Sequence, residues 1–478
     1  MSATATTASA AELNRFVVGE NGLGLRQKTL LYIFCLSFAF DFKGPFGGTI
    51  FQYIFTVVAL GSGCLLWFQS FGKTAPHYTR LMMITLGSIF LLGYGTIIMN
   101  NYFEFSNIPL VRSLRFMFPY AMLVVSAGVM SSFAKNGTKL SVIVPPMITA
   151  AVLSMVWRQI YASVVVDVQL EEQRYQALSP ALIFLIPMVM CFIALRSKQN
   201  VFYWILLGAS LITIFLSITR IFLFSIFIAA IGITICLFLQ GRLFQPALII
   251  KRAVIGVLGL LAFSLALIIT MEIRPNVVAN WEKRLSVTSD LQDATRVADV
   301  SRILRVAAAT GMVNAVKKEP YTIMLGKGFG AGYYLDRKYE GIIRTQIPFD
   351  AREQWHVVDV GLVYIFFAGG IVIGGLILGI FLATLYLMIK AMYRMKKLGI
   401  KQEGFVWAAV SFVGVLFALS QMPSSYVFQE RMSAQTVGIL IGVGMVVADR
   451  VNHLVRVQKR ERIRSNVRFD GVSEAAPA

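Results

Sequence analysis

The chain has 478 residues, of which 57% are hydrophobic and only 14% carry a charge, and its formal net charge is +20. Soluble globular proteins need a more polar surface than this composition can supply, so that class of protein is excluded. Apolar runs of about twenty residues, the length that a helix needs to cross a bilayer, recur from one end of the chain to the other. The sequence therefore predicts an all-α, polytopic integral membrane protein.

About twelve apolar segments are candidate transmembrane helices, and each boundary carries an error of several residues. They are residues 29–42, 48–69, 81–99, 114–133, 140–161, 179–195, 201–219, 221–240, 253–271, 357–389, 405–421 and 433–449. An even number of spans returns both ends of the chain to the same side of the membrane. The chain then divides into a disordered lead (1–25), a first membrane part (26–271), a long loop (272–356), a second membrane part (357–449) and a basic tail (450–478).

Lysine and arginine are shared unevenly between the two sides of the membrane. One set of short loops is rich in them and contains Lys73, Arg80, Lys135, Lys139, Arg196, Arg242, Arg394 and Lys397. The tail from Arg450 to Arg468 is also basic, whereas the opposite short loops are poorer in these residues. Because basic loops stay in the cytoplasm, both termini are predicted to be cytoplasmic and the long loop extracytoplasmic. The same basic residues flank apolar segments, where they contact membrane lipids, so nucleic acid is not an expected partner.

The long loop contains two recognisable local patterns. Alanines and apolar residues recur at helical spacing over 296–316 and predict a helix that Pro320 ends. The sequence LeuGlyLysGlyPheGlyAlaGly at 325–332 predicts a tight turn. It lacks the GlyLysSer or GlyLysThr ending of a phosphate-binding loop, and we interpret it as a structural element.

The apolar segment that follows the long loop is longer than a membrane span requires. As one straight helix, residues 357–389 would measure about 50 Å, against about 30 Å for the hydrocarbon core of a bilayer. Either this helix is strongly tilted, or its first turns stand outside the membrane, or it breaks. We expect a break near Gly369–Gly370, with the first turns above the membrane.

His356 is the first candidate catalytic residue. The predicted topology places His77 and His453 in the cytoplasm and leaves His356 alone on the outer side, where an imidazole can serve as a general base near neutral pH. Asp359 lies about one helical turn further along and can hold the imidazole tautomer. A histidine beside Trp355 at the membrane interface can equally be an anchor, and both interpretations stay open.

Arginines form the second candidate group. Arg220 stands between two predicted outer helix ends, where an arginine is costly without a partner. Arg302 and Arg305 are spaced i, i+3 and share one face of the predicted loop helix. Guanidinium groups bind phosphate oxygens in pairs, so such a set suits a diphosphate. Snorkelling, or pairing with Asp299 or Glu319, is the alternative.

No group of His, Cys, Asp or Glu on the predicted outer side has metal-ligand spacing. A glycosyltransferase that grips a nucleotide sugar through a divalent metal is therefore disfavoured. We expect neither a metal nor another cofactor.

Four short motifs occur in a defined order over residues 200–375. They are SerIleThrArg (217–220), ArgIleLeuArg (302–305), LeuGlyLysGlyPheGly (325–330) and HisValValAspValGlyLeuValTyr (356–364) with GlyGly downstream. In this order and topology they resemble the bacterial family of O-antigen ligases and Wzy-type polysaccharide polymerases. The family often has Asn after the histidine, whereas this chain has Val357.

The resemblance implies a fold related to the GT-C glycosyltransferases. It also implies transfer of a glycan from undecaprenyl diphosphate to an acceptor hydroxyl at the outer face of the bacterial inner membrane, without a metal. On this basis the family histidine corresponds to His356 and the family arginines to Arg220 and to Arg302 or Arg305. Arg352 and Trp355 are added from adjacency alone, Arg352 as a further diphosphate ligand.

We predict a polymerase that joins lipid-linked repeats of an exopolysaccharide or O-antigen. Its partners would be the undecaprenyl-diphosphate-linked donor, the acceptor glycan and membrane lipids, with a flippase and a chain-length regulator acting beside it. A ligase that transfers the glycan to lipid A core is the first alternative, because it uses the same donor chemistry. A transporter or flippase is an alternative of another class, which the lack of a recognisable internal repeat or of a clear mid-span charge disfavours.

Overall fold

The structure is a computed structural model of the whole chain. It describes residues 10–37, 39, 48–104, 108–160, 179–196, 200–216, 220–242, 268, 297–339, 354–355, 360–400, 403–423, 428 and 431–473. Within these ranges the chain is helical apart from turns, short irregular segments and isolated bridges at Asn21–Thr138 and Tyr333–Trp355. The prediction of an all-α protein is confirmed for this part of the chain.

The helices are named in chain order. They are α1 (Ala10–Val18), α2 (Leu25–Leu36), α3 (Gly48–Phe68), α4 (His77–Tyr102), α5 (Leu110–Asn136), α6 (Val144–Ile160), α8 (Leu182–Leu195), α9 (Val201–Leu216), α10 (Arg220–Gln240), α13 (Val297–Lys317), α14 (Pro320–Leu325), α16 (Gly361–Lys397), α17 (Glu403–Gln421) and α18 (Arg431–Ser473), with short 3₁₀ turns at Leu140–Ile143 and Arg337–Tyr339.

Seven stretches among the described helices are long and apolar enough to cross a membrane. They are α4, α5, the stretch Leu140–Ile160 that contains α6, α10, α16, α17 and the stretch Arg431–Glu461 of α18. Shorter apolar helices accompany them at Tyr53–Phe68, Leu182–Leu195 and Val201–Phe215. The protein is thus a multi-pass helical membrane protein, whereas the count of about twelve spans remains a prediction. The predicted span 253–271 lies outside the described residues except for Ile268.

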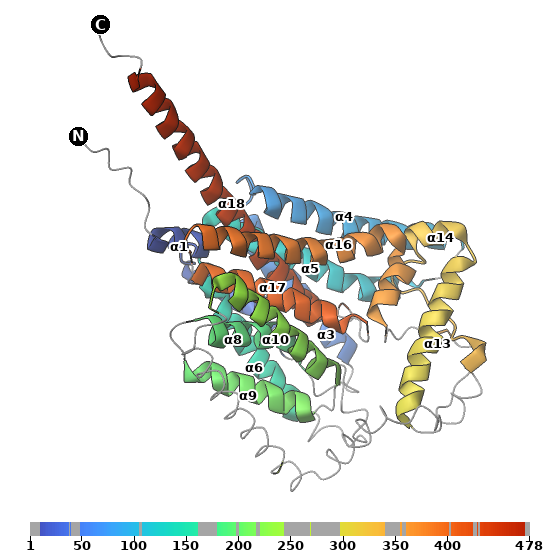
Figure 1. Cartoon of the computed structure of the whole chain (residues 1–478). Helices are drawn as coiled ribbons and strands as arrows, with labels where there is room; N and C mark the ends of the chain where they lie inside the picture. The colour runs from blue at the N-terminus through green and yellow to red at the C-terminus, as the bar shows by residue number, and fades with distance from the viewer. Residues whose placement is uncertain are drawn as a thin grey trace.

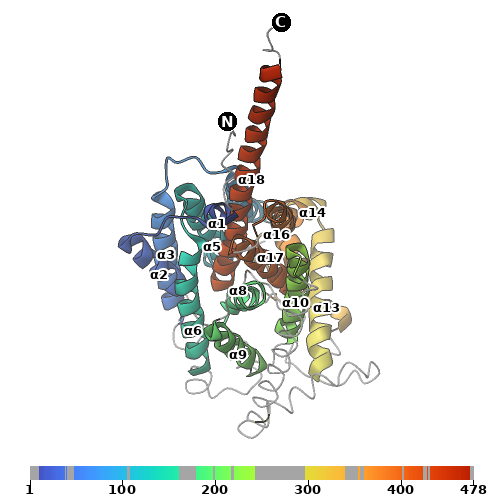
Figure 2. The same cartoon turned by 60° about the vertical axis from the view of Figure 1, so that its left-hand side comes forward.

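The membrane helices run side by side, and the two ends of the bundle differ (Figure 1). The first described helix, α1, and the projecting C-terminal part of α18 lie at one end, which we call the end of the termini. The other end carries α14 and α13, and α13 runs at a steep angle to the bundle helices. Figure 2, turned by 60°, keeps α13 and α14 beside α16 and shows α18 rising from the middle of the bundle.

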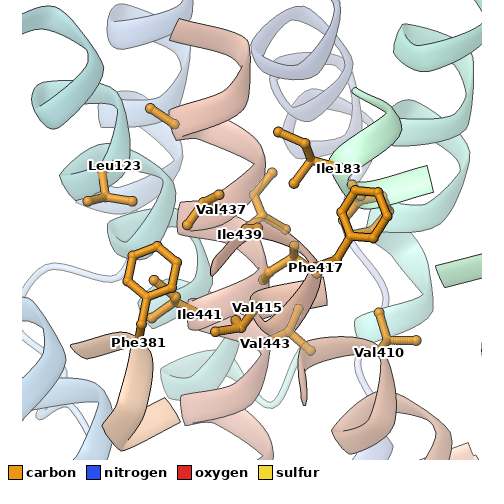
Figure 3. Packing of buried hydrophobic residues seen from close by; sticks show 14 of the residues in the cluster. Leu123, Ile183, Phe381, Val410, Val415, Phe417, Val437, Ile439, Ile441 and Val443 are labelled. Carbon is orange, nitrogen blue, oxygen red and sulfur yellow. The ribbon is translucent and has the colours of Figure 1, made fainter. Parts of the chain in front are cut away.

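The core of the bundle forms around α18, whose apolar window is entirely buried. Its side chains interdigitate with those of neighbouring helices, as Figure 3 shows for Val437, Ile441 and Phe381. Helices in a membrane gain little from excluding water and associate through close packing of small residues. A Cβ added at Gly442 would lie 2.5 Å from Met130 Cβ of α5, so this glycine sets how closely the two helices approach.

Two adjacent charged residues of α18 fix the end of the bundle that holds the termini. Asp449 accepts hydrogen bonds from the backbone amides of Tyr78 and Thr79, each at 2.8 Å, and so satisfies donors in the first turn of α4. Arg450 donates to the carbonyl oxygens of Val17, Phe133 and Thr138 at 2.9–3.1 Å. The predicted boundary between membrane part and tail, at 449/450, therefore falls inside one continuous helix.

The N-terminal segment differs from the disordered lead that its polar sequence predicts. Residues Ala10–Val18 form α1, and Val17 and Val18 are buried. The prediction overlooked that a short helix can be fixed by partners far along the chain. Asn14 Oδ1 accepts a hydrogen bond from the backbone amide of Gly404 at 2.9 Å, in addition to the bond from Arg450 to Val17.

Candidate functional site

The long loop supplies the two helices at the end of the bundle opposite the termini. α13 spans Val297–Lys317, which confirms the predicted helix over 296–316. The expectation that Pro320 ends this helix is wrong, because α13 has already ended and Pro320 is the first residue of α14. Proline suits that position, since the first helical amide has no partner within the helix and the ring presets φ. α14 and α13 both pack against α16.

The predicted break in the following helix is confirmed at Gly370 of α16, whose φ of 62° and ψ of −168° are not helical. A break exposes carbonyl groups that need donors from elsewhere, especially at the edge of a membrane. The glycine-rich turn supplies two of them. Lys327 N donates to Phe367 O at 2.8 Å, and Gly328 N donates to Ala368 O at 2.9 Å.

Glycine is required on both sides of this contact. A Cβ at Gly326 would lie 2.3 Å from Ala368 O, and a Cβ at Gly370 would lie 2.2 Å from Met324 O. Both glycines also have φ in the positive region that other residues rarely adopt. The interpretation of residues 325–332 as a structural turn is supported, and its structural role is to fill the break in α16.

A polar cluster of four side chains, Asn100, Glu319, Tyr321 and Lys327, surrounds this turn. Lys327 pairs with Glu319 at 2.5 Å, and Tyr321 OH lies 3.1 Å from both Glu319 Oε2 and Asn100 Oδ1. Asn100, near the end of α4, donates from Nδ2 to Gly326 O at 3.3 Å. Asn100 and Lys327 are buried. The cluster therefore ties α4, α14 and the glycine-rich turn together.

Electrostatics within the cluster follow from these contacts. The hydrogen bond from Lys327, reinforced by the bond from Tyr321 and the charge of Lys327, lowers the pKa of Glu319 despite its partial burial. Burial, together with the hydrogen bond and charge of Glu319, raises the pKa of Tyr321. Glu319 is thus ionised and Tyr321 neutral at physiological pH. Of the partners considered for Glu319, the structure describes Lys327.

The turn continues into a second set of contacts that reaches Trp355. Phe329 is fully buried, with its ring 4.6 Å from that of Tyr120. Gly330 N donates to Tyr364 OH at 3.0 Å. Tyr333 and Trp355 then exchange two backbone hydrogen bonds, of 3.0 and 2.7 Å. Trp355 immediately precedes His356 in the sequence, so this bridge anchors the start of the predicted catalytic segment.

The sequence-predicted site residues are described to different extents. His356, Asp359 and Arg352 lie outside the described residues, and their predicted roles stay predictions. For Arg220 and Arg302 the structure describes the helical backbone, in α10 and α13, but not the side chain.

Arg305 is described together with its side chain. It is partly buried on α13, three residues after Arg302, so the expected shared helix face is present. Its Nε is buried and has no hydrogen-bond partner among the described residues. Ala307 O, two residues further along, accepts a hydrogen bond from Asp336 N at 3.3 Å, which ties α13 to the segment that follows the turn.

Arg220 begins α10 at the same end of the bundle as this site. Ser225 of α10 and Ser420 of α17 share a hydrogen bond of 2.8 Å, so the start of α10 lies level with the end of α17. There Met422 O accepts a hydrogen bond from Leu362 N, in the first turn of α16, at 2.9 Å. The starts of α10 and α16 and the end of α17 therefore gather at one end, and α13 packs on α16 beside them.

Sequence reasoning missed the polar cluster. Lys327 was visible inside a glycine-rich motif, and Asn100 was visible as a polar residue at the end of an apolar span. Their connection was not visible, because Asn100 and Tyr321 are separated by 221 positions.

No protein-family model matches this chain, and no curated protein sequence matches it. Among the described residues, no group of three or more His, Cys, Asp or Glu side chains is placed to hold a metal ion. The expectation of a metal-independent reaction remains a prediction.

Proposed function

We propose that the protein is a glycosyltransferase with a fold of the GT-C kind, and that it polymerises oligosaccharide repeats carried on undecaprenyl diphosphate at the outer face of the bacterial inner membrane. The observation that carries the proposal is the position of α13. This helix brings Arg302 and Arg305 to the end of a membrane bundle opposite both termini, and packs against α16. In the predicted topology this end faces the outer side, where the anionic headgroup of a lipid-linked donor would lie.

The chemistry of Arg305 supports a diphosphate ligand. A guanidinium group has five N–H donors in a rigid fork that matches phosphate oxygens. The Nε of Arg305 is buried and has no hydrogen-bond partner within the described part of the chain, so a ligand oxygen that reached it would satisfy this donor. Arg302, on the same face, and Arg220 and Arg352 would add to the positive charge.

The proposed reaction is a displacement at the anomeric carbon of the donor glycan. The acceptor hydroxyl oxygen forms a bond to that carbon while the bond to the diphosphate oxygen breaks. His356, oriented by Asp359, takes the hydroxyl proton. The arginines stabilise the negative charge that develops on the departing undecaprenyl diphosphate, an effect typically worth about 3 kcal/mol per well-placed donor. The diphosphate leaves without needing a proton.

Two transfer reactions use this donor and differ in the acceptor. A polymerase extends another lipid-linked glycan and yields a ladder of products, whereas a ligase adds one glycan to lipid A core. The test is to reconstitute the purified protein with a lipid-linked donor repeat and each acceptor, and to analyse the products by gel and mass spectrometry. A ladder formed without lipid A core supports the polymerase; products attached only to lipid A core support the ligase. Absence of transfer to either acceptor, in protein shown to bind donor lipid, would refute both.

Variants of the site residues test the assigned roles at matched protein levels. His356→Ala is expected to abolish transfer and leave donor binding intact, and Asp359→Asn to be milder. Arg305→Ala is expected to weaken both donor binding and turnover, with only partial recovery in Arg305→Lys, because an ammonium group lacks the planar fork. Lys338→Ala, at an exposed lysine of the same loop, is the control for loss of charge alone. Full activity of His356→Ala would leave that residue as a membrane anchor.

A further inference from the structure

The contacts around the glycine-rich turn connect the membrane bundle to both parts of the candidate site. From the turn, the chain reaches Trp355 through the backbone bridge with Tyr333. It also reaches α13, because a Cβ at Gly311 would lie 2.1 Å from Tyr334 O and Asp336 N bonds to Ala307 O. The position of the turn therefore helps to determine where Arg305 and Trp355 stand relative to the membrane helices, together with the direct packing of α13 on α16.

The turn is itself held by a small number of polar contacts. Its backbone fills the break in α16, and the side chains that secure it belong to α4, to the start of α14 and to the turn itself. Asn100 contributes from α4, which is distant from the loop in sequence: it lies 226 positions from Gly326, to whose oxygen it donates. Tyr321 and Glu319 link Asn100 to Lys327.

Apolar side chains would be enough to hold a loop in place, whereas this turn is held by polar ones. Buried polar groups make a structure more rigid when all of them are paired, and they destabilise it when one partner is lost. An apolar contact would hold the turn without requiring that every polar group be paired, but it would define the position of the turn less precisely. Within the described chain, the contacts of the cluster are therefore suited to fixing the position of the turn.

We propose that Asn100, Glu319, Tyr321 and Lys327 are positioning residues for the transfer reaction. They hold the glycine-rich turn in the break of α16. The turn thus fixes the distance between the diphosphate-binding face of α13 and the segment that begins at Trp355. This inference rests on the proposed function. In this proposal the four residues act through the turn and not by contact with the reacting atoms.

The matched pair of variants is Glu319→Gln and Glu403→Gln. Both carboxylates accept a hydrogen bond from one cation, Lys327 in the first case and Arg196 in the second, and their side chains are 34% and 38% exposed. Glu403 is the first residue of α17, beside Gly404, whose amide donates to Asn14 of α1, so it stands at the end of the bundle that holds α1. Glu319→Gln is expected to lower kcat by about tenfold or more, because small misplacements of reacting groups have effects of that size. Glu403→Gln is expected to leave kcat unchanged.

The remaining readouts separate positioning from loss of folded protein. Donor KM and the stoichiometry of donor binding are expected to stay at wild-type values in Glu319→Gln and in Asn100→Ala, so that only kcat falls. The charge swap Glu319→Lys with Lys327→Glu is expected to recover part of the loss. An unchanged kcat in both single variants, or a fall that only follows the binding stoichiometry, overturns the proposal.

Amide hydrogen exchange tests the same inference without any assay of transfer. The amides of Lys327, Gly328 and Gly330 are hydrogen-bonded in the wild-type protein and are expected to exchange slowly. Asn100→Ala is expected to accelerate their exchange at least about tenfold while the interior of α18 is unaffected. If the exchange changes but the wild-type protein transfers no glycan, the proposed function fails and the structural part of the inference stands. If the exchange does not change, the cluster does not hold the turn.

Discussion

The contact between the glycine-rich turn and the break in α16 makes Gly370→Ala the most informative single substitution. Gly370 has φ 62° and ψ −168°, a region that is essentially restricted to glycine. Any other residue there costs about 1–3 kcal/mol in backbone strain alone. The new Cβ would also stand 2.2 Å from Met324 O, so the turn must move away.

Moving the turn weakens the two backbone hydrogen bonds from Lys327 and Gly328 to α16, each worth about 1 kcal/mol. Strain and lost hydrogen bonds together predict a destabilisation of about 3–5 kcal/mol. Gly375→Ala is the control on the same helix, because Gly375 has helical geometry and a Cβ there meets nothing within 4 Å. That substitution is expected to be neutral or to stabilise by up to about 1 kcal/mol.

The assay is thermal unfolding of the two purified variants in one detergent, together with amide exchange of residues 325–333. Gly370→Ala should unfold at a clearly lower temperature than the wild-type protein, and the turn should lose its protection. Equal stability of Gly370→Ala and Gly375→Ala would refute the account of the turn as the element that fills the break.

Other consequences follow from the described contacts. The double variant Tyr333→Cys with Trp355→Cys should form a disulfide on mild oxidation. Residues that exchange both backbone hydrogen bonds stand about 5.5 Å apart at Cα, which is within the range that a disulfide spans. Failure to cross-link would argue against the backbone bridge. In intact cells an impermeant maleimide should label Tyr334→Cys but not Arg460→Cys; the reverse pattern would invert the predicted topology and place the site in the cytoplasm. Because the pKa of Glu319 is lowered in the folded state, its pairing with Lys327 contributes stability above the ordinary carboxyl range and loses it as pH falls through the lowered value. The stability difference between wild type and Glu319→Gln is expected to be below about 1 kcal/mol, because the carboxylate of the pair is 34% exposed. It should vanish in acid, where the pairing is lost, and a difference that persists there would contradict the assignment.

Several features were predictable from the sequence because they depend on local pattern. The helix α13 follows from the spacing of alanines and apolar residues, and it begins at Val297, next to the predicted start at 296. The break at Gly370 follows from two facts available without a structure, a segment too long for the bilayer and a pair of adjacent glycines within it.

Other features were not predictable because they join distant parts of the chain. Glycine at 326 and at 370 indicates conformational freedom at each place, but nothing in either pattern shows that the two glycines face each other. The polar sequence of the first residues suggested disorder, yet Arg450 of α18 and Gly404 of α17 supply partners that hold α1. In the second case tertiary contacts overrode local composition.

The contrast between Arg450 and Arg305 illustrates how a structural role differs from a binding role. Arg450 is buried and donates to three carbonyl oxygens, one in α1 and two at or just beyond the end of α5, so these donors are already used by the protein. Arg305 lies at the other end of the bundle, is only partly buried, and keeps an enclosed Nε without a partner among the described residues. Leaving a buried N–H of a charged group unpaired costs free energy, and binding of an anion would recover it.

Arg450→Met should therefore lower the stability of the protein with or without donor lipid. Arg305→Met should instead leave the stability of the donor-free protein unchanged or higher, and it should remove the stabilisation by donor. If donor lipid stabilises Arg305→Met as strongly as the wild-type protein, Arg305 does not bind the diphosphate.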